Sequence, residues 1–257
     1  MSDILQAGSV EMTVAAGVAT ITFFHPSHNA MPAAQLRRLQ QAVEEAGERE
    51  EIKVVVLSSQ GERTFCAGAS FDELAALDNF PDARQFFMGF AGVINAMRRC
   101  PKFVIARVQG KAIGGGVGLA AAADYCAATA AADVKLSELA VGIGPFVVGP
   151  AVAKKVGQAA FQQLAIDAST FQSAAWAQEK GLYQAVLPDI QSLDEHIAAL
   201  AQRLAASSTA AMQALKEVFW QDASHWDELL AERAAISGRL ILSAPAQEAI
   251  ARFKQKS

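Results

Sequence analysis

Residues 103–129 read FVIARVQGKAIGGGVGLAAAADYCAAT, and this stretch decides the fold class. It opens with an apolar run of strand length, as expected for a strand that is covered on both faces. A glycine-rich bend over 109–118 follows, and residues 119–124 predict a helix that is too short to be amphipathic at a surface. A second strand is predicted over 125–130, so the segment alternates strand and helix as an α/β protein does.

The chain before this stretch repeats the same order of elements. IKVVVL at 52–57 predicts another buried strand, and the small residues of 65–70 and a helical region over 71–99 follow it. Nearer the start, VEMTVAA and VATITFF are rich in β-branched residues and predict two strands around Gly17. Pro32 then opens a helix whose apolar residues recur at helical spacing.

The chain after this stretch becomes mostly helical. An N-cap serine and a C′ glycine bracket a helix over 173–180, and a last strand is predicted over 183–187. After that strand we expect three or four helices. The composition therefore divides the chain into a core over 1–190 and a C-terminal helical region over 191–257. The apolar faces of the last helices include Ile197, Leu200, Leu204, Met212, Leu215 and Phe219.

Composition and charge narrow the class of protein. The 257 residues carry 22 Lys and Arg against 26 Asp and Glu, and no basic stripe alternates with aromatic residues. A nucleic-acid partner is therefore not expected. The N-terminus lacks a basic segment followed by an apolar core, and no apolar run reaches the ~18 residues of a membrane span. We expect a cytoplasmic protein without a membrane partner.

The cysteines bear on metal binding and on the redox compartment. Cys66, Cys100 and Cys126 are widely spaced and include no CxxC pair. An odd number at such spacing argues against a disulfide framework and against a zinc cluster, and it fits a reducing compartment. We therefore expect no metal site.

Two glycine-rich bends, AGA at 67–69 and GGG at 114–116, each follow a buried strand. Glycine lets the backbone turn sharply and approach a ligand closely, and an N–H group at a helix N-terminus lacks an intrahelical partner. Two such bends side by side can direct two N–H donors at one oxygen atom, which is what an oxyanion hole requires. The alternative is that the glycines only permit tight packing of strand on helix. Neither bend matches the GxGxxG or GK[ST] patterns of nucleotide-binding loops.

Several short strings share their order and spacing with one known family. The strings are NAM at 29–31, FCAGA at 65–69, CPK at 100–102, QGKAIGGG at 109–116, SELAVGI at 137–143 and EKGL at 179–182. Together they resemble the crotonase superfamily, the enoyl-CoA hydratase/isomerase family, over essentially the whole chain, more weakly after about residue 190.

The resemblance implies a fold and a ligand. The fold is a crotonase-like α/β spiral core of ββα repeats with C-terminal helices that assist trimerisation, so a homotrimer or homohexamer is expected. The ligand is an acyl-CoA thioester whose carbonyl oxygen accepts hydrogen bonds from the backbone N–H groups of Ala69 and Gly115. Coenzyme A is then carried as part of the substrate, and no separate cofactor is expected. The positions assigned to substrate binding are Ala67, Gly68, Phe71, Gly114, Gly118 and Phe146.

The acid/base residues decide between the reactions of the family. Its hydratases use two glutamates, and here the second is present as Glu138 whereas the first position is Gly118. Moving a double bond needs one base that removes a proton and returns it elsewhere, and a glutamate whose pKa is raised by an apolar pocket can do this. The resemblance therefore implies, most simply, an enoyl-CoA isomerase. The alternative for Glu138 is a structural role at a helix N-terminus after Ser137.

Two other functions stay open from the sequence. One is an enoyl-CoA or methylglutaconyl-CoA hydratase in which another group supplies the second acid or base. The other is a non-catalytic acyl-CoA-binding subunit that lost its activity with the glutamate now replaced by Gly118.

Five further residues carry narrower expectations. Phe146, in the string GPFVVGP, either reshapes the acyl pocket or packs in the core. Phe253 and Lys254 resemble the family's tail that contacts the adenine and phosphates of CoA, and a solvated tail is the alternative. Asp124 is interpreted as structural. Ser70 is interpreted as a helix cap rather than a nucleophile, because no histidine stands in a recognisable hydrolase motif.

Overall fold

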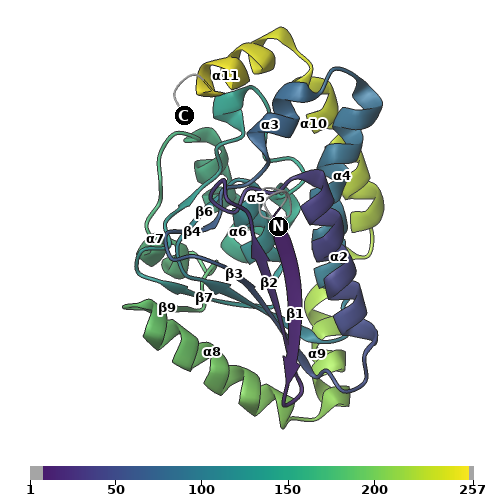
Figure 1. Ribbon diagram of the computed structural model, residues 1–257, viewed down its shortest axis with the longest axis vertical. Coiled ribbons are helices and arrows are strands. Elements are labelled where there is room, and N and C mark those ends of the chain that lie inside the picture. Colours follow the sequence, from purple (N-terminus) through teal and green to yellow (C-terminus); the bar gives the residue numbers. More distant parts are fainter. Residues whose placement is uncertain (1–7, 255–257) are drawn as a thin grey trace.

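The computed structural model describes residues 8–254, with side chains for residues 8–252, as two β-sheets and surrounding helices (Figure 1). The larger sheet has six strands in the order β1 (Ser9–Ala15), β2 (Val18–Phe24), β3 (Val54–Ser59), β5 (Phe103–Val108), β7 (Tyr125–Thr129) and β9 (Ala185–Leu187). The smaller has three, β4 (Thr64–Cys66), β6 (Lys111–Ile113) and β8 (Val134–Lys135). β1 and β2 pair antiparallel, and the other neighbours within both sheets pair parallel.

Each repeat of the chain places one strand in each sheet and then a helix. β3 and β4 are followed by α3 (Phe71–Ala76), β5 and β6 by α5 (Gly115–Ala122), and β7 and β8 by η1 (Leu139–Val141) and α6 (Gly149–Ile166). Because strands of successive repeats lie side by side in both sheets, the chain winds as a spiral. The expected ββα spiral core and the helical C-terminal region are confirmed.

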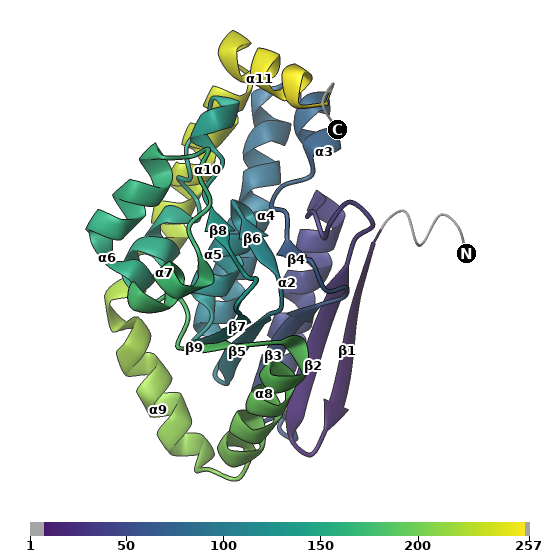
Figure 2. The same cartoon turned by 90° about the vertical axis from the view of Figure 1, so that its left-hand side faces the viewer.

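The larger sheet is covered by helices on both faces (Figure 2). Alternate residues of its central strands point to opposite sides, so Val55 and Leu57 pack into the main core, whereas Val54 and Val56 pack toward α8. None of these four side chains is more than 4% exposed. Burial on both faces explains why the strand sequences are continuous apolar runs. The covering helices include α2 (Ala33–Glu48), α4 (Phe80–Arg99) and α8 (Ile190–Ala205).

Two helix boundaries differ from those predicted. The helical region expected over 71–99 is two helices, α3 and α4. The side chain of Asn79 accepts a hydrogen bond from the Asp82 N–H and so caps the N-terminus of α4. The helix expected over 119–124 begins at Gly115, so the glycines form its first turn. This second difference matters for chemistry, because the first N–H groups of a helix have no acceptor within it.

Four helices end the described chain: α8, α9 (Thr209–Trp220), α10 (Trp226–Ile241) and α11 (Ala244–Lys254). α10 packs along α4, and α11 packs against α3 and η1, so this region lies directly on the spiral core. The division of the chain at 190/191 stays a prediction. Between the last strands, α7 (Ala174–Glu179) starts at the predicted serine cap.

The prediction that Leu215 and Phe219 belong to the buried apolar face of α9 is wrong. Leu215 and Phe219 are 49% and 47% exposed, and Val218 beside them is 58% exposed. The helix instead turns Lys216 inward, where its ammonium group lies 2.8 Å from the Asp124 carboxylate and donates to two backbone carbonyl oxygens. These partners satisfy the buried charge, an arrangement that an apolar pattern does not anticipate.

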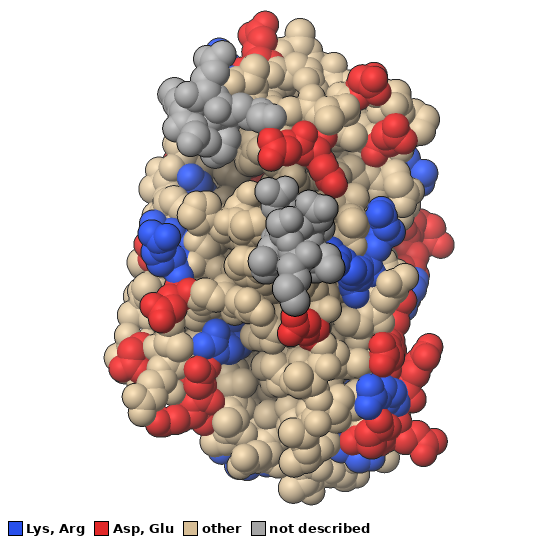
Figure 3. All heavy atoms as spheres, viewed as in Figure 1, with Lys and Arg blue, Asp and Glu red and all other residues tan. Residues whose placement is uncertain are grey.

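Charged side chains of both signs are interspersed over the face seen in Figure 3. Among the described residues, no helix is long and apolar enough to cross a membrane. Location in the cytoplasm stays a prediction.

Candidate active site

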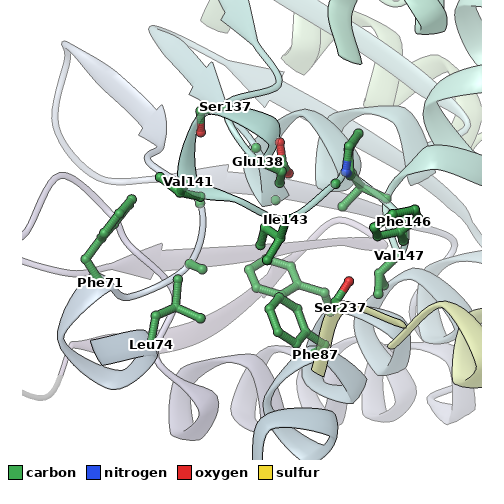
Figure 4. A pocket seen from close by; sticks show the side chains of 18 of the residues that line it. Phe71, Leu74, Phe87, Ser137, Glu138, Val141, Ile143, Phe146, Val147 and Ser237 are labelled. Atoms are coloured by element: carbon green, nitrogen blue, oxygen red, sulfur yellow. The ribbon is translucent and has the colours of Figure 1, made fainter. Parts of the chain in front are cut away.

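One pocket is lined by both glycine-rich segments of the sequence (Figure 4). It holds about 540 Å³, part of which is open to solvent. Its other walls come from α3, α4, α10 and the segment 137–148. Of the residues predicted for the site, Ala67, Gly68, Ala69, Phe71, Gly114, Gly115, Glu138 and Phe146 line the pocket.

The two glycine-rich segments touch because they follow neighbouring strands of the smaller sheet. β4 ends before the first segment and β6 before the second, and the two strands pair in parallel. Gly68 has a φ of +87°, and a Cβ there would lie 2.9 Å from the Ile113 carbonyl oxygen and 3.4 Å from the Gly115 nitrogen. Glycine is therefore needed both for the backbone conformation and for the close approach.

Two backbone N–H groups in this contact have no acceptor. Within the described residues, neither Ala69 nor Gly115 donates its N–H to any hydrogen bond. Gly115 is the first residue of α5, so its N–H has no intrahelical partner. Both residues line the pocket, which leaves two donors available to a bound oxygen atom.

The loop that carries Ala69 is held by a turn near the N-terminus. The Met31 N–H donates to the Gly68 carbonyl at 2.8 Å, and the Ala67 N–H donates to the His28 carbonyl at 3.2 Å. The buried Asn29 amide donates to two carbonyl oxygens of the segment before the loop, at 2.8 and 2.9 Å. The string NAM therefore positions the loop, a role that the sequence pattern alone did not assign.

The Glu138 carboxyl group lies against the start of α5. A Cβ added to Gly114, whose φ is +52°, would stand 3.0 Å from Glu138 Oε1. Gly114 itself is fixed by its N–H, which donates to the Lys135 carbonyl at 2.8 Å. The carboxyl group thus lies next to the residue that precedes Gly115 and its free N–H.

Burial changes the protonation of Glu138. Its Oε2 atom is buried and has no hydrogen-bond partner within the described residues. This loss of solvation disfavours the charged form and raises the pKa of Glu138 to about 7. Glu138 precedes η1, yet its side chain makes no capping hydrogen bond there. The geometry therefore favours an acid/base role over the structural alternative.

Gly118 does not line the pocket. It is buried in α5, and a Cβ placed on it would lie 2.3 Å from Val148 Cγ1 and 2.6 Å from Val148 Cβ. Val148 itself lines the pocket. The valine therefore occupies the space where a longer side chain at position 118 would begin.

The rest of the pocket is largely apolar, and sequence reasoning missed several of its residues. Phe146 lines it together with residues on three helices, Leu74 of α3, Phe87 and Phe90 of α4, and Ser237 of α10. The two α4 phenylalanines stand at helical spacing, which describes a core-facing side chain equally well. Ser237 is brought to the site only by the packing of α10 on α4.

Asp124 has the structural role that the sequence predicted. Its carboxylate accepts hydrogen bonds from the Val104 N–H at 2.7 Å and from the Trp220 indole N–H at 2.8 Å. Its partnership with Lys216 adds the buried ion pair described above. These bonds tie a strand, the loop after α5 and α9 together, away from the pocket.

Ser70 is a helix cap, as predicted. Its hydroxyl accepts a hydrogen bond from the Glu73 N–H at the start of α3. Phe253 and Lys254 belong to the α11 backbone, and their side chains lie outside the described residues, so their proposed contact with CoA stays a prediction.

Known proteins resemble the chain over most of its length. The family model for enoyl-CoA hydratase/isomerase matches residues 13–257. The chain is 30% identical over 251 residues to a probable enoyl-CoA hydratase of Rhodobacter capsulatus, and the match covers 96% of this chain and 95% of that protein. It is 28% identical over 209 residues to the peroxisomal Delta(3,5)-Delta(2,4)-dienoyl-CoA isomerase of Arabidopsis thaliana, with 75% and 73% covered. The crystal structure of an enoyl-CoA hydratase from Mycobacterium avium subsp. paratuberculosis matches with a TM-score of 0.85 and 25% identity, over 96% of each chain.

Proposed function

The chain belongs to the enoyl-CoA hydratase/isomerase family and is an acyl-CoA enzyme, and on this premise we propose that it isomerises the double bond of an enoyl-CoA. One observation carries the proposal. Among the described residues that line the pocket, Glu138 is the only carboxyl group, and Val148 fills the place where a second would begin. Isomerisation is the reaction of this family for which one base suffices.

The proposed reaction starts with the thioester oxygen of a 3-enoyl-CoA accepting hydrogen bonds from the N–H groups of Ala69 and Gly115. Ionised Glu138 removes a proton from C2, and the electron pair moves through C1 onto the oxygen to form a dienolate. The two N–H groups stabilise that negative charge, and each such donor is worth about 10²–10³ in rate. Protonated Glu138 then returns the proton to C4, which gives the 2-enoyl-CoA with no change in composition.

The pKa of Glu138 supports this use of one group in both directions. A carboxyl group with a pKa of about 7 has both its protonated and its ionised forms populated at neutral pH. It can therefore accept a proton in the first step and release it in the second without help from another residue.

Hydration is the second candidate, because the 30% identical relative is named a hydratase. Adding water requires one group that activates the water and one that protonates C2. In this pocket Glu138 alone would have to do both. The methylglutaconyl-CoA form of this alternative also places a carboxylate on the acyl group. A non-catalytic acyl-CoA-binding subunit is the third candidate.

The decisive experiment measures isomerisation of a 3-enoyl-CoA and hydration of a 2-enoyl-CoA by the purified wild-type protein. Isomerisation without hydration supports the proposal, whereas hydration alone selects the second candidate. Glu138→Gln should lower the turnover number at least ~100-fold while acyl-CoA binding persists, as expected for loss of the general base. Turnover that is negligible in both proteins, with binding retained, selects the non-catalytic subunit.

A matched control is Glu179→Gln. Glu179 is exposed at the end of α7 and pairs only with the neighbouring Lys180 in the described structure. This change removes the same charge outside the pocket, so turnover should equal that of the wild type.

We also propose that the chain assembles as a homotrimer or a pair of homotrimers. The exposed apolar residues of α9, Leu215, Val218 and Phe219, support an association surface, because contiguous exposed apolar side chains are typical of interfaces. Light scattering should give a mass of three or six chains, and replacing Val218 and Phe219 by Glu should lower it. A monomer in the wild type contradicts this assembly.

A further inference from the structure

Ser237 of α10 places a hydroxyl group among the apolar walls of the pocket. The residue is 1% exposed and lines the pocket beside aromatic and branched side chains. In Figure 4 its oxygen points away from the α10 ribbon toward the space near Phe87 and Val147. The other polar side chains of the described lining, Ser137 and Glu138, come from a different segment of the chain.

The Ser237 hydroxyl has no partner in the described protein. It neither donates a hydrogen bond to, nor accepts one from, any described side chain or backbone group, including the carbonyl one turn earlier in α10 that a helical serine often uses. The Ser237 oxygen does not belong to the fully enclosed atoms without a partner, so it faces space that a bound group can reach. A group that enters the pocket with the substrate is in position to supply the missing bond.

Helix packing alone does not explain a hydroxyl at this position. The close approach of α10 to α4 is made by the next residue, Gly238, where a Cβ would lie 2.9 Å from the Arg84 backbone nitrogen. Alanine is smaller than serine, so it would fit position 237 without bringing a polar atom to the pocket wall. The hydroxyl is therefore the feature that needs a functional account.

The walls also limit the charge of the group that Ser237 meets. No lysine, arginine or histidine occurs among the described residues of the lining. A carboxylate on the far part of the acyl group would be buried without a counter-charge, which is strongly unfavourable. A hydroxyl or ketone oxygen carries no such cost, and serine can donate to either.

We propose that Ser237 is a specificity-determining residue that hydrogen-bonds an uncharged oxygen, a hydroxyl or a ketone, on the distal part of the substrate's acyl group. The inference rests on the proposed function, since it takes the pocket to hold an acyl-CoA. It names the substrate class as oxygenated, uncharged acyl-CoA thioesters, and it sets acyl groups that end in a carboxylate apart as poor substrates.

The test compares three enoyl-CoA thioesters of equal chain length that end in a methyl group, a methyl ketone or a carboxylate. Wild type should use the ketone with a kcat/KM about three- to tenfold above that of the unsubstituted chain, the range of one hydrogen bond, and the carboxylate with the lowest value. Ser237→Ala should lower kcat/KM for the ketone by that factor and leave the unsubstituted chain unchanged or improved. Equal losses on both chains would show a packing role and overturn the proposal.

A second measurement separates this inference from the proposed reaction. Saturated acyl-CoA thioesters with and without the ketone are titrated calorimetrically into wild type, Ser237→Ala and Ser237→Cys, which has a slightly larger side chain and a weaker donor. Wild type should bind the ketone about three- to tenfold more tightly, and this preference should vanish in Ser237→Ala and weaken in Ser237→Cys. If no enoyl-CoA reacts, the proposed function fails while this ratio still tests Ser237. If the two thioesters bind wild type equally, the Ser237 proposal fails even in an active enzyme.

Ser243→Ala is the control on the same stretch of chain. The Ser243 hydroxyl donates to the Leu240 carbonyl at the end of α10 and lies outside the pocket. This variant should keep the wild-type preference for the ketone, and thermal unfolding should show that each variant is folded.

Discussion

The Glu138 carboxyl group packs so closely on the Gly114 backbone that a methyl group on Gly114 would displace it. A Cβ on Gly114 would stand 3.0 Å from Glu138 Oε1 and 3.4 Å from Glu138 Cδ. The position of the carboxyl group is thus set by the absence of a side chain on the residue before Gly115. Crowding, protonation and packing around this contact each have a measurable consequence.

Gly114→Ala should lower the turnover number at least ~10-fold with acyl-CoA binding retained, because the new methyl group displaces the carboxyl group. The backbone of Gly114, with φ +52° and ψ −116°, also adds strain of roughly 1–3 kcal/mol for a residue other than glycine. Gly157→Ala is the matched control, since its φ is +77° with no atom within 4 Å of the added Cβ. Equal turnover in the two variants would show that strain, and not crowding of Glu138, is responsible.

The pH profile of kcat/KM should report the raised pKa of Glu138. The base must be ionised to accept a proton, so kcat/KM should rise with pH up to about 7 and then level off. A profile that levels off below about pH 5, near the ordinary range of a solvated glutamate, would mean that the carboxyl group is solvated in the working enzyme.

The free energy of unfolding should fall with rising pH because of Glu138, whereas kcat/KM should rise. The pKa of the Glu138 carboxyl is ordinarily 4.5 and is about 7 in the folded protein, so between these values the folded state holds a proton that the unfolded chain has lost. The contribution is therefore fully present below pH 4.5 and lost as the pH rises through about 7. Relative to Glu138→Gln, the free energy of unfolding of wild type should fall by at most about 3 kcal/mol from about pH 4 to about pH 8, measured by urea denaturation. A pH-independent difference between the two proteins contradicts the buried, raised-pKa carboxyl group.

The contact between Gly118 and Val148 should show as coupled effects on stability. Gly118→Ala alone forces its Cβ into Val148 and should cost about 1–3 kcal/mol, the usual range for overpacking. Combined with Val148→Ala, which removes the nearer contact at Cγ1 and keeps the one at Cβ, the loss should be smaller than the sum of the two single changes. Additive losses would mean that the cost of Gly118→Ala does not come from its contact with Val148.

The turn around Asn29 should affect the turnover number through the loop that it holds. Asn29→Ala removes two hydrogen bonds to backbone carbonyls and loosens the segment that carries Ala69, so kcat should fall about tenfold. Asn79→Ala removes the cap of α4 and two exposed side-chain hydrogen bonds, all outside the pocket, so it should cost about 1 kcal/mol of stability and leave kcat unchanged. Parallel falls in kcat would assign the effect to general destabilisation.

The sequence predicted most of the spiral because its signals are local. Residues 103–108 form a strand with the predicted bounds, because a strand buried on both faces of a sheet is a continuous apolar run of this length. The glycine bends and Glu138 could be placed in one pocket only with the help of family strings, because their contact depends on pairing between strands distant in the chain. Ser237 could not be found at all, because no periodic or motif signal distinguishes it from other small residues of α10. The contact of Val148 with Gly118 could not be predicted either, because it depends on side-chain packing between two segments.

The pairing of β4 with β6 has a consequence for which parts of the pocket a substitution can change. The loops that bear the two unpaired amides leave adjacent strands, so their separation is inherited from the ~4.8 Å spacing of a β-sheet rather than from any side chain. The spacing of the two amides therefore depends on backbone pairing, whereas the walls near Val148 and Ser237 are made by side chains. Substitutions at Val148 or Ser237 can therefore reshape the walls of the pocket without altering the distance between the two amides.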